Sequence, residues 1–253
     1  MIDIALIDSG LGGISLLSRL TKTFYFKRIV YFADTENLPY GTKSQKKLLD
    51  ITIKNLKTII KKFKPKIIIF GCNTIGTTII EDIKRIFNNQ NIFAIKPVFD
   101  YTIAKKDKTL LLATNTTIKN IKKNNCYKNN TKNIILYKMP LLATKVEKYI
   151  QNLDKTVPYL NRKLKKYNSV SKVFLGCTHY YFVKKQIQNI FPEAQIIDGG
   201  DFLINKLKRF VCNNIDLFKN IKFKKKIKVK LVLTKKSSKV KIYKKLIRQE
   251  IFN

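Results

Sequence analysis

The sequence has very few residues of the kinds that bind metal ions. Its 253 residues include one histidine, His179, and four cysteines, and no two cysteines form a CxxC pair. A zinc site needs several Cys and His ligands close together, so we expect no bound metal. Disulfides are not expected either, because a cytosolic chain of this size neither needs nor keeps them. The thiols are interpreted as free, and they stand at positions 72, 126, 177 and 212.

Long hydrophobic runs are also absent. Apolar runs such as Ile67 to Phe70 and Leu110 to Ala113 are among the longest, and they are far too short to cross a bilayer. The first residues lack the basic region and the longer apolar stretch of a signal peptide. These absences predict a soluble, cytoplasmic protein with no membrane partner, and an apolar share of 45% predicts a folded one.

Acidic residues are scarce. The chain has 16 Asp and Glu against 52 Lys and Arg, which gives a formal net charge of +36. Such a balance often indicates a nucleic-acid partner. Here, however, the lysines are spread along the whole chain beside many Asn and Ile residues, and all three residue types have A/T-rich codons. We therefore favour a biased genome over a nucleic-acid partner, while the positive field would still attract a small anionic substrate.

What the sequence does contain is a regular alternation of short apolar runs and helical segments. Strands are expected at residues 4–7, 29–32, 66–70, 92–95, 109–113, 134–137, 172–175, 194–197 and 228–233. Helices are expected up to Leu20, over 46–63, after Asn73, from about Ile118 and over 239–247. Continuously apolar strands separated by helices predict an α/β fold with mostly parallel, doubly wound sheets that are covered on both faces.

Two segments of the chain resemble each other. Residues 66–74 and 172–179 both run from an apolar strand through Gly-Cys into polar residues that open a helix. The pattern predicts two similar domains facing each other. Cys72 and Cys177 would then each lie at the carboxyl end of a strand, which is where ligands bind in open α/β sheets. We expect the active site in the cleft between the two domains.

Two opposed thiols suit the chemistry of an amino-acid racemase. Inverting the α-carbon requires a base on one face and an acid on the other. A thiol has a reference pKa of about 8.5, which backbone N–H groups at a helix start can lower. A free cysteine is more often a small buried residue, but two in matching contexts favour the catalytic interpretation. His179, two positions after Cys177, would adjust that thiol. Cys126 and Cys212 have no partner motif and are interpreted as structural.

Two turns follow the first two strands. The glycine-rich turn 8–13 lacks both the GxGxxG fingerprint and the GKS/T ending of a P-loop, so it gives little support for nucleotide binding. It would instead present Asp8 and Ser9 at the edge of the sheet. The turn 34–41 would place Tyr40 and Gly41 at the same edge, although Pro-Tyr-Gly alone is only a turn signature.

Taken together, the segments IDSGLGG, ADTENLPYGTKS, GCNT and LGCTHY, in this order and spacing, resemble the glutamate racemases. The resemblance runs from about residue 2 to residue 205 and more weakly through the tail. It implies conversion of L-glutamate to D-glutamate for peptidoglycan, by a two-base mechanism and without any cofactor. It also implies a first domain of residues 1–95 and 206–253 and a second of residues 96–205. Many members of the family are dimers, so we consider a homodimer.

The resemblance also assigns roles to individual residues. The catalytic pair maps onto Cys72 and Cys177, with Asp8 assisting Cys72, and with His179, helped by Glu147, assisting Cys177. In the family the first cysteine deprotonates the D-isomer and the second the L-isomer. Substrate contacts map onto Asp8, Ser9, Tyr40, Gly41, Asn73, Thr74, Thr114, Thr117, Thr178 and His179.

The chain departs from the family pattern at a few positions. Gly71, Ile75 and Gly76 replace the usual residues around the first cysteine motif, and Ala33 stands where a glycine is usual. None of these changes removes a catalytic group. Two alternatives stay open: a racemase for aspartate or another amino acid, and a basic nucleic-acid-binding protein on a retired racemase scaffold. The presence of the full catalytic set argues against the second.

Overall fold

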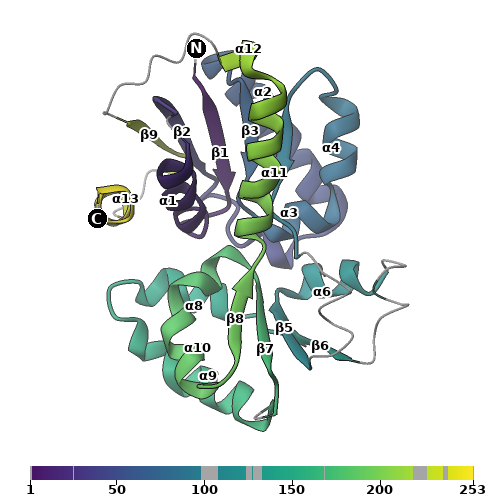
Figure 1. Cartoon of the computed structure of the whole chain (residues 1–253), viewed down its shortest axis with the longest axis vertical. Coiled ribbons are helices and arrows are strands. Elements are labelled where there is room, and N and C mark those ends of the chain that lie inside the picture. Colours follow the sequence, from purple (N-terminus) through teal and green to yellow (C-terminus); the bar gives the residue numbers. More distant parts are fainter. Residues whose placement is uncertain are drawn as a thin grey trace.

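The computed structural model describes residues 2–24, 26–97, 108–123, 127, 133–167, 169–218, 227–235 and 239–252, and the statements below concern these residues. Cys126 lies outside them. Two parallel sheets lie one above the other along the long axis of the molecule (Figure 1). No helix in the described ranges is long and apolar enough to cross a membrane.

The first sheet has five parallel strands in the order β4-β3-β1-β2-β9. Its strands are β1 (Ile4–Asp8), β2 (Arg28–Ala33), β3 (Ile67–Phe70), β4 (Ile92–Ala94) and β9 (Lys228–Leu233). Every residue of β1 and β3 is buried, as expected for apolar strands covered on both faces. Strand β9 pairs with β2 from Arg28↔Lys228 to Ala33↔Leu233, so the end of the chain returns to the first sheet.

The second sheet has four parallel strands in the order β6-β5-β7-β8. These are β5 (Thr109–Ala113), β6 (Ile134–Lys138), β7 (Lys172–Gly176) and β8 (Gln195–Asp198). The strand β5 is wholly buried and lies between β6 and β7. The predicted fold class, α/β with two similar parallel sheets, is confirmed.

Helices cover both sheets and connect the strands. They are α1 (Ile14–Thr23), η1 (Tyr40–Thr42), α2 (Gln45–Phe63), α3 (Asn73–Thr78), α4 (Ile80–Ile86), α6 (Asn115–Ile121), α8 (Leu142–Tyr149), η3 (Leu153–Thr156), α9 (Val157–Leu164), η4 (Lys165–Tyr167), η5 (Thr178–Val183), α10 (Lys184–Ile190), α11 (Gly200–Asn213), α12 (Ile215–Phe218) and α13 (Val240–Phe252). Helix α2 packs an apolar row, including Leu48, Leu56 and Ile59, against one face of the first sheet.

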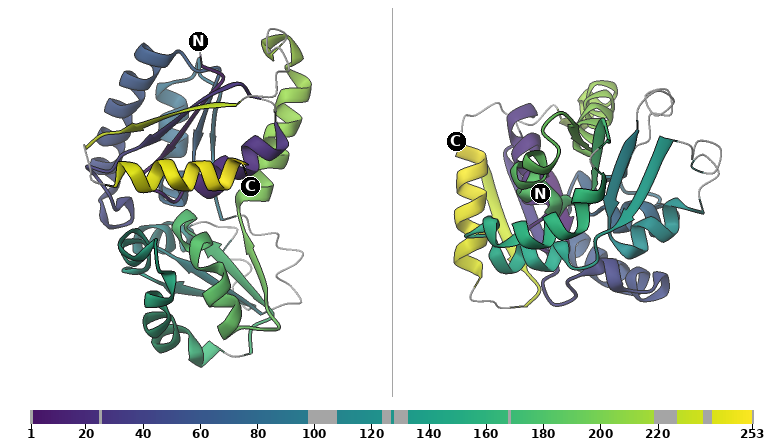
Figure 2. Two further views of the ribbon diagram at one scale, coloured as in Figure 1. Left: turned by 90° about the vertical axis from the view of Figure 1, so that its left-hand side faces the viewer. Right: turned by 90° about the horizontal axis from the view of Figure 1, so that it is seen from below.

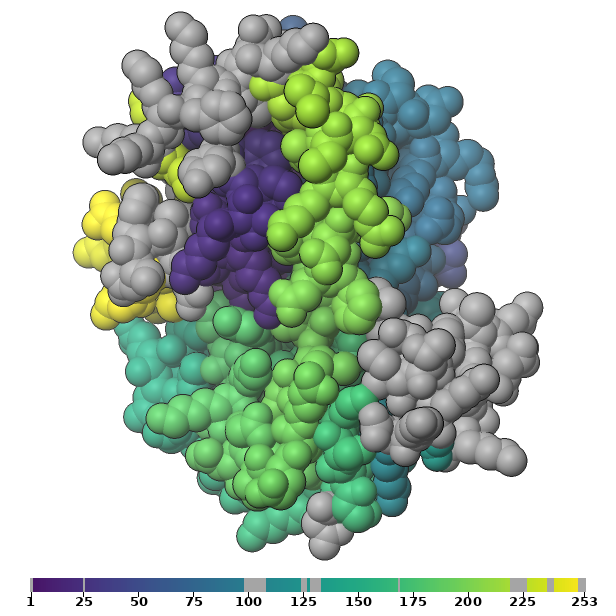
Figure 3. All heavy atoms as spheres, viewed as in Figure 1, coloured from purple at the N-terminus to yellow at the C-terminus, as the bar shows by residue number. Residues whose placement is uncertain are grey.

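The last helices tie the end of the chain to its beginning. Helix α13 packs beside α1, as the left-hand view of Figure 2 shows. Helix α11 follows the second sheet and runs along the first, in contact with α1 and β4. In the space-filling view its yellow-green atoms lie beside the purple atoms of the N-terminal segment (Figure 3). The domain boundary predicted between residues 205 and 206 falls inside α11, and the division into domains stays a prediction.

Candidate active site

The site lies where the carboxyl ends of the two sheets meet. Asp8 ends β1 and Cys177 follows β7, so their loops come from different sheets. The Thr178 hydroxyl donates to Asp8 Oδ2 at 3.1 Å and links these two loops directly. A second link joins the Thr74 and Thr114 hydroxyls at 3.2 Å. The two edges therefore form one site rather than two.

Cys72 is buried at the start of α3, with Asp8 as its charged neighbour. Burial raises the pKa of the Cys72 thiol well above its ordinary value, and the negative charge of Asp8 raises it further. The backbone N–H groups of Ile75 and Thr74 lower this pKa, as the sequence predicts for a helix start, but they do not outweigh burial. The expected lowering of the thiol pKa by the helix start is therefore wrong for Cys72 as a net effect.

Asp8 has an unusual carboxylate. Its side chain is fully buried and accepts hydrogen bonds from Gly10 N–H at 2.9 Å and from the hydroxyls of Ser9 and Thr178. Burial raises the pKa of Asp8 to about 6, although the positive charge of His179 lowers it. Asp8 can therefore gain or lose a proton near neutral pH.

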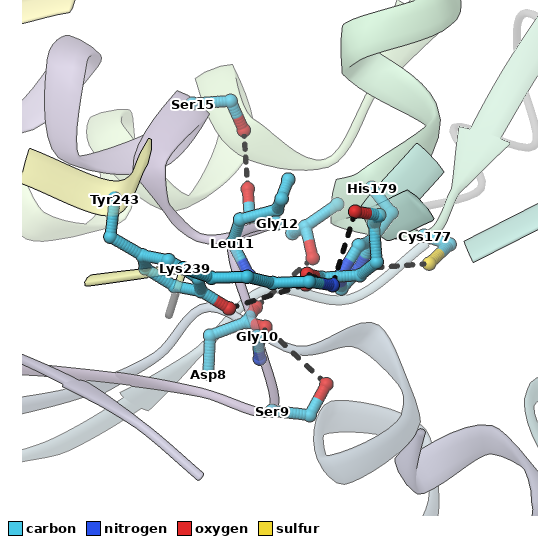
Figure 4. A network of polar contacts seen from close by, with 12 residues as sticks. Asp8, Ser9, Gly10, Leu11, Gly12, Ser15, Cys177, His179, Lys239 and Tyr243 are labelled. Atoms are coloured by element: carbon cyan, nitrogen blue, oxygen red, sulfur yellow. Dashed lines mark hydrogen bonds and ion pairs between the residues drawn. The ribbon is translucent and has the colours of Figure 1, made fainter. Parts of the chain in front are cut away.

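Cys177 lies beside the only histidine of the chain. Its Sγ is 3.9 Å from His179 Nδ1 (Figure 4). Nε2 of the same ring is 3.0 Å from Glu147 Oε1. Burial lowers the pKa of His179, but its hydrogen bonds to Cys177 and Glu147 raise it well above its ordinary value. The pKa of Glu147, in spite of burial, is lowered by its bond to His179. The geometry thus joins a thiol, an imidazole and a carboxylate in a row.

Glu147 also reaches the glycine-rich turn. Its Oε1 accepts from Leu11 N–H at 2.8 Å. Gly10 is essential to this approach, because a Cβ at that position would overlap Glu147 Oε1. The sequence assigns Glu147 only through the family resemblance, since nothing in its local pattern shows a contact with residues 136 positions earlier.

The predicted substrate threonines form a cluster. Thr114 caps α6 by accepting from Thr117 N–H, and its hydroxyl donates to the Thr117 hydroxyl at 2.9 Å. Thr74, from the other sheet, lies 3.2 Å from the Thr114 hydroxyl. Gly41 lies against the same cluster, and its carbonyl accepts from the Thr116 hydroxyl at 2.8 Å.

Asn73 stands out because of its side-chain amide. Among the described residues, neither its Nδ2 nor its Oδ1 has a hydrogen-bond partner, and both atoms are buried. An unpaired buried amide is costly, so its presence indicates a group held ready for a ligand. A small cavity at the junction is lined by Asn73, Cys177 and Thr178, together with Arg19 and Asp198.

Tyr40 is held by a residue that the sequence did not assign. Its hydroxyl donates to Asp34 Oδ2 at 2.6 Å, and Asp34 also accepts from Asn37, Asn55 and Thr234. Asp34 comes directly after β2, and Asp8 is the last residue of the neighbouring strand β1. This similar position at the end of a strand is the signal by which the sequence could have identified Asp34. Its role is to fix the turn that carries Tyr40 and Gly41.

Four further residues support the site without having been predicted. Arg19 on α1 forms a two-bond ion pair with Asp198 at the end of β8, at 2.6 and 2.7 Å, and so ties the two sheets together. Tyr243 and Lys239 reach Glu147 from the end of the chain. By contrast, Cys212, which is interpreted as structural from the sequence, is exposed on α11, so it does not belong to the packed core.

The structure explains one of the residues near Cys72 that differ from the family pattern, Gly76. Gly76 allows α3 to lie directly against the backbone of Ile95, because a Cβ there would overlap the Ile95 carbonyl oxygen. Helix α3 ends at Thr78, and Ile79 separates it from α4, which begins at Ile80. Within the ranges that the structure describes, no group of three or more His, Cys, Asp and Glu side chains is arranged to hold a metal ion.

Comparisons with known proteins show which family this chain is similar to. No family model matches the chain. The glutamate racemase of Buchnera aphidicola subsp. Schizaphis graminum is 33% identical over 256 residues, covering 98% of this chain and 93% of the relative. That of Clostridium acetobutylicum is 31% identical over 81% of this chain and 82% of the relative. A crystal structure of the Francisella tularensis glutamate racemase with D-glutamate has a TM-score of 0.80 at 21% identity, covering 100% of this chain and 94% of that one.

Proposed function

The chain belongs to the glutamate racemase family, and we propose that it interconverts L-glutamate and D-glutamate by proton transfer at Cα between Cys72 and Cys177. One observation carries the proposal. Two buried cysteines follow strands of two facing sheets, and each has a different acid–base partner, Asp8 for Cys72 and His179 for Cys177. A racemase needs just such a pair of groups, one for each face of the α-carbon.

In the D-to-L direction, the Cys72 thiolate removes the Cα proton and becomes a thiol. The Cys177 thiol then gives a proton to the opposite face of the carbanion and becomes a thiolate. The L-to-D direction runs these steps in reverse, so no atom is gained or lost. Burial raises the pKa of Cys72, which makes its thiolate a strong base toward a weakly acidic Cα–H. We assign to Asp8 the task of taking the proton of the Cys72 thiol before a turnover in the D-to-L direction.

On the other side, His179 exchanges a proton with Cys177. Its ring lies between the thiol and Glu147, so the protonated ring can pass its Nδ1 proton to the Cys177 thiolate and become neutral, and Glu147 stabilises the imidazolium that forms when the proton returns. General acid–base assistance of this kind contributes about 100- to 10,000-fold to a rate.

The remaining predicted residues would hold the substrate. Asn73 supports this role most directly, because a substrate carboxylate and ammonium would supply the partners that its amide lacks. We propose the other substrate contacts at Ser9, Tyr40, Gly41, Thr74, Thr114, Thr117, Thr178 and His179, in addition to Asp8.

The product D-glutamate would serve peptidoglycan synthesis, and the reaction as proposed uses only side chains and no pyridoxal cofactor. A location in the cytoplasm, a homodimeric assembly and the lack of a nucleic-acid partner stay predictions from the sequence. The excess of positive charge would favour the approach of glutamate, which carries a net negative charge.

The test is to incubate the protein with each enantiomer of glutamate in D2O and to follow deuterium at Cα. Wild type should exchange both isomers, and exchange of neither would overturn the proposal. Cys72→Ser and Cys177→Ser should each lose net racemisation by at least about 100-fold. Cys212→Ser is the matched control, because this thiol is exposed on α11 and should be dispensable.

The same assay separates the alternatives. Racemisation of aspartate in preference to glutamate would change the substrate but keep the two-thiol chemistry. Salt-sensitive RNA binding together with no Cα exchange would instead support a nucleic-acid-binding protein on a retired scaffold.

A further inference from the structure

Glu147 is a meeting point of four segments that are far apart in the sequence. It lies on α8, its Oε1 accepts from Leu11 N–H in the first turn, and the same oxygen bonds to His179 on η5. The fourth segment is the end of the chain, which contributes Lys239 and Tyr243 (Figure 4). Of these contacts, the proposed reaction uses only the one with His179. It gives no role to Lys239 and Tyr243 at the end of the chain.

Tyr243 and Lys239 approach the two oxygens of the carboxylate separately. The Tyr243 hydroxyl donates to Oε1 at 3.4 Å from a fully packed position on α13. Lys239 Nζ is 3.7 Å from Oε2 and also donates to the Glu147 carbonyl at 3.2 Å. Among the described residues, Oε2 is buried and has no hydrogen-bond partner, and the ammonium of Lys239 lies beside it as a balancing positive charge.

The charges around His179 form a balanced set. The groups that face its ring are Cys177 on the same loop, Glu147 on α8 and Asp8 at the end of β1. Behind Glu147 lie Lys239 and Tyr243. When His179 is protonated, the carboxylates of Asp8 and Glu147 therefore lie near two cations, the His179 imidazolium and the Lys239 ammonium. Without Lys239 or Tyr243, the Glu147 carboxylate would stabilise the protonated imidazole of His179 more strongly.

We propose that Lys239 and Tyr243 act through Glu147 to limit how tightly His179 holds its proton. The contacts of both residues described above are with Glu147, so both act as positioning residues. This inference rests on the proposed function, because the proton on His179 matters only if Cys177 exchanges one with it. It gives the returning C-terminal segment an indirect part, through Glu147 and His179, in the chemistry of the Cys177 face.

The experiment uses the fact that His179 is the only histidine. In protein labelled with 15N in the imidazole ring, NMR reports the protonation of this single side chain without any need for turnover. Lys239→Met should move the titration of His179 to higher pH, because a positive charge beside Glu147 is lost. At a pH within the titration, the ratio of protonated to neutral ring should rise about two- to fivefold, the scale for a partly exposed charge pair.

Four further measurements make the result specific. Lys239→Arg keeps the charge and should restore the wild-type titration. Lys241→Met, at an exposed position two residues along, should leave it unchanged. Because the Lys239 side chain is 41% exposed, added salt should reduce the difference between Lys239→Met and wild type. Tyr243→Phe should move the titration in the same direction as Lys239→Met.

Other outcomes would overturn the inference. If Lys239 only holds α13 in place, its loss would let water reach His179 and move the titration down toward the ordinary value. No movement at all would equally contradict the proposal. Deuterium exchange at Cα by wild type is measured in parallel. Exchange without a shift of the titration rejects this inference alone, whereas a shift without exchange rejects the racemase function alone.

Discussion

Replacing Asp8 by Asn should stabilise the protein above pH 7 and change its stability little below pH 4. Asp8 is fully buried, and burial raises its pKa from the ordinary 3.8 to about 6. A group whose pKa is raised by folding contributes stability that is fully present below its unfolded pKa and is lost as the pH rises through its folded pKa. At 1.36 kcal/mol per pKa unit, the ionised carboxylate costs the folded protein about 3 kcal/mol.

The geometry allows Asn to replace Asp with little disturbance. Its amide oxygen can still accept from Gly10 N–H, and the Thr178 hydroxyl can accept from the new amide instead of donating. For a chain of this size, about 3 kcal/mol corresponds to a rise in melting temperature of roughly 6–12 °C at pH 8. Racemisation should fall about 100-fold or more, because Asp8 no longer exchanges a proton with Cys72.

Thermal and guanidinium unfolding at pH 4 and pH 8, followed by circular dichroism, would measure the difference. Asp50→Asn is the control, since Asp50 is exposed on α2 and its replacement should have the same small effect at both pH values. Equal stability of Asp8→Asn and wild type at pH 8 would refute the reasoning, because it would mean that burying the charged carboxylate costs nothing.

Two other substitutions test the binding and packing of the site. Asn73→Ala should raise the KM for glutamate about tenfold or more without lowering the melting temperature, since it removes two buried polar atoms that lack partners; a large loss of stability would contradict a ligand-binding role. Gly10→Ala should reduce kcat about 100-fold or more, because its Cβ displaces the Glu147 carboxylate from His179; full activity in steady-state assays would show that this contact is dispensable.

The strands were predictable from sequence because their signal is local. Runs such as residues 67–70 and 109–113 are apolar throughout, and a strand buried on both faces needs nothing else. One helix start was placed too late, near Ile118, whereas α6 begins at Asn115. Thr114 explains the difference, since its hydroxyl accepts from Thr117 N–H and caps the helix earlier than the apolar pattern indicates.

The partners of the site residues were not predictable in the same way. Tyr243 and Lys239 lie about ninety residues from Glu147 and have no local pattern that reports the contact. The pKa of Cys72 illustrates the same limit. A helix start is visible in the sequence, but the burial that outweighs it depends on how both sheets pack around the thiol. The reacting groups can therefore be identified from the sequence, whereas their pKa values depend on the packing of the fold.

The scarcity of acidic residues makes the buried ones more informative. Of 16 Asp and Glu residues, at least Asp3, Asp8, Asp34 and Glu147 are buried. A surface carboxylate can be replaced at little cost, whereas removing a buried one leaves its donors unsatisfied at about 1–3 kcal/mol each. Asp3, for example, accepts from the N–H groups of two successive residues. A drift of composition toward Lys and Asn would thus remove surface carboxylates first. The net charge then reflects the surface, and the carboxylates that are left inside mark the fold and the reaction.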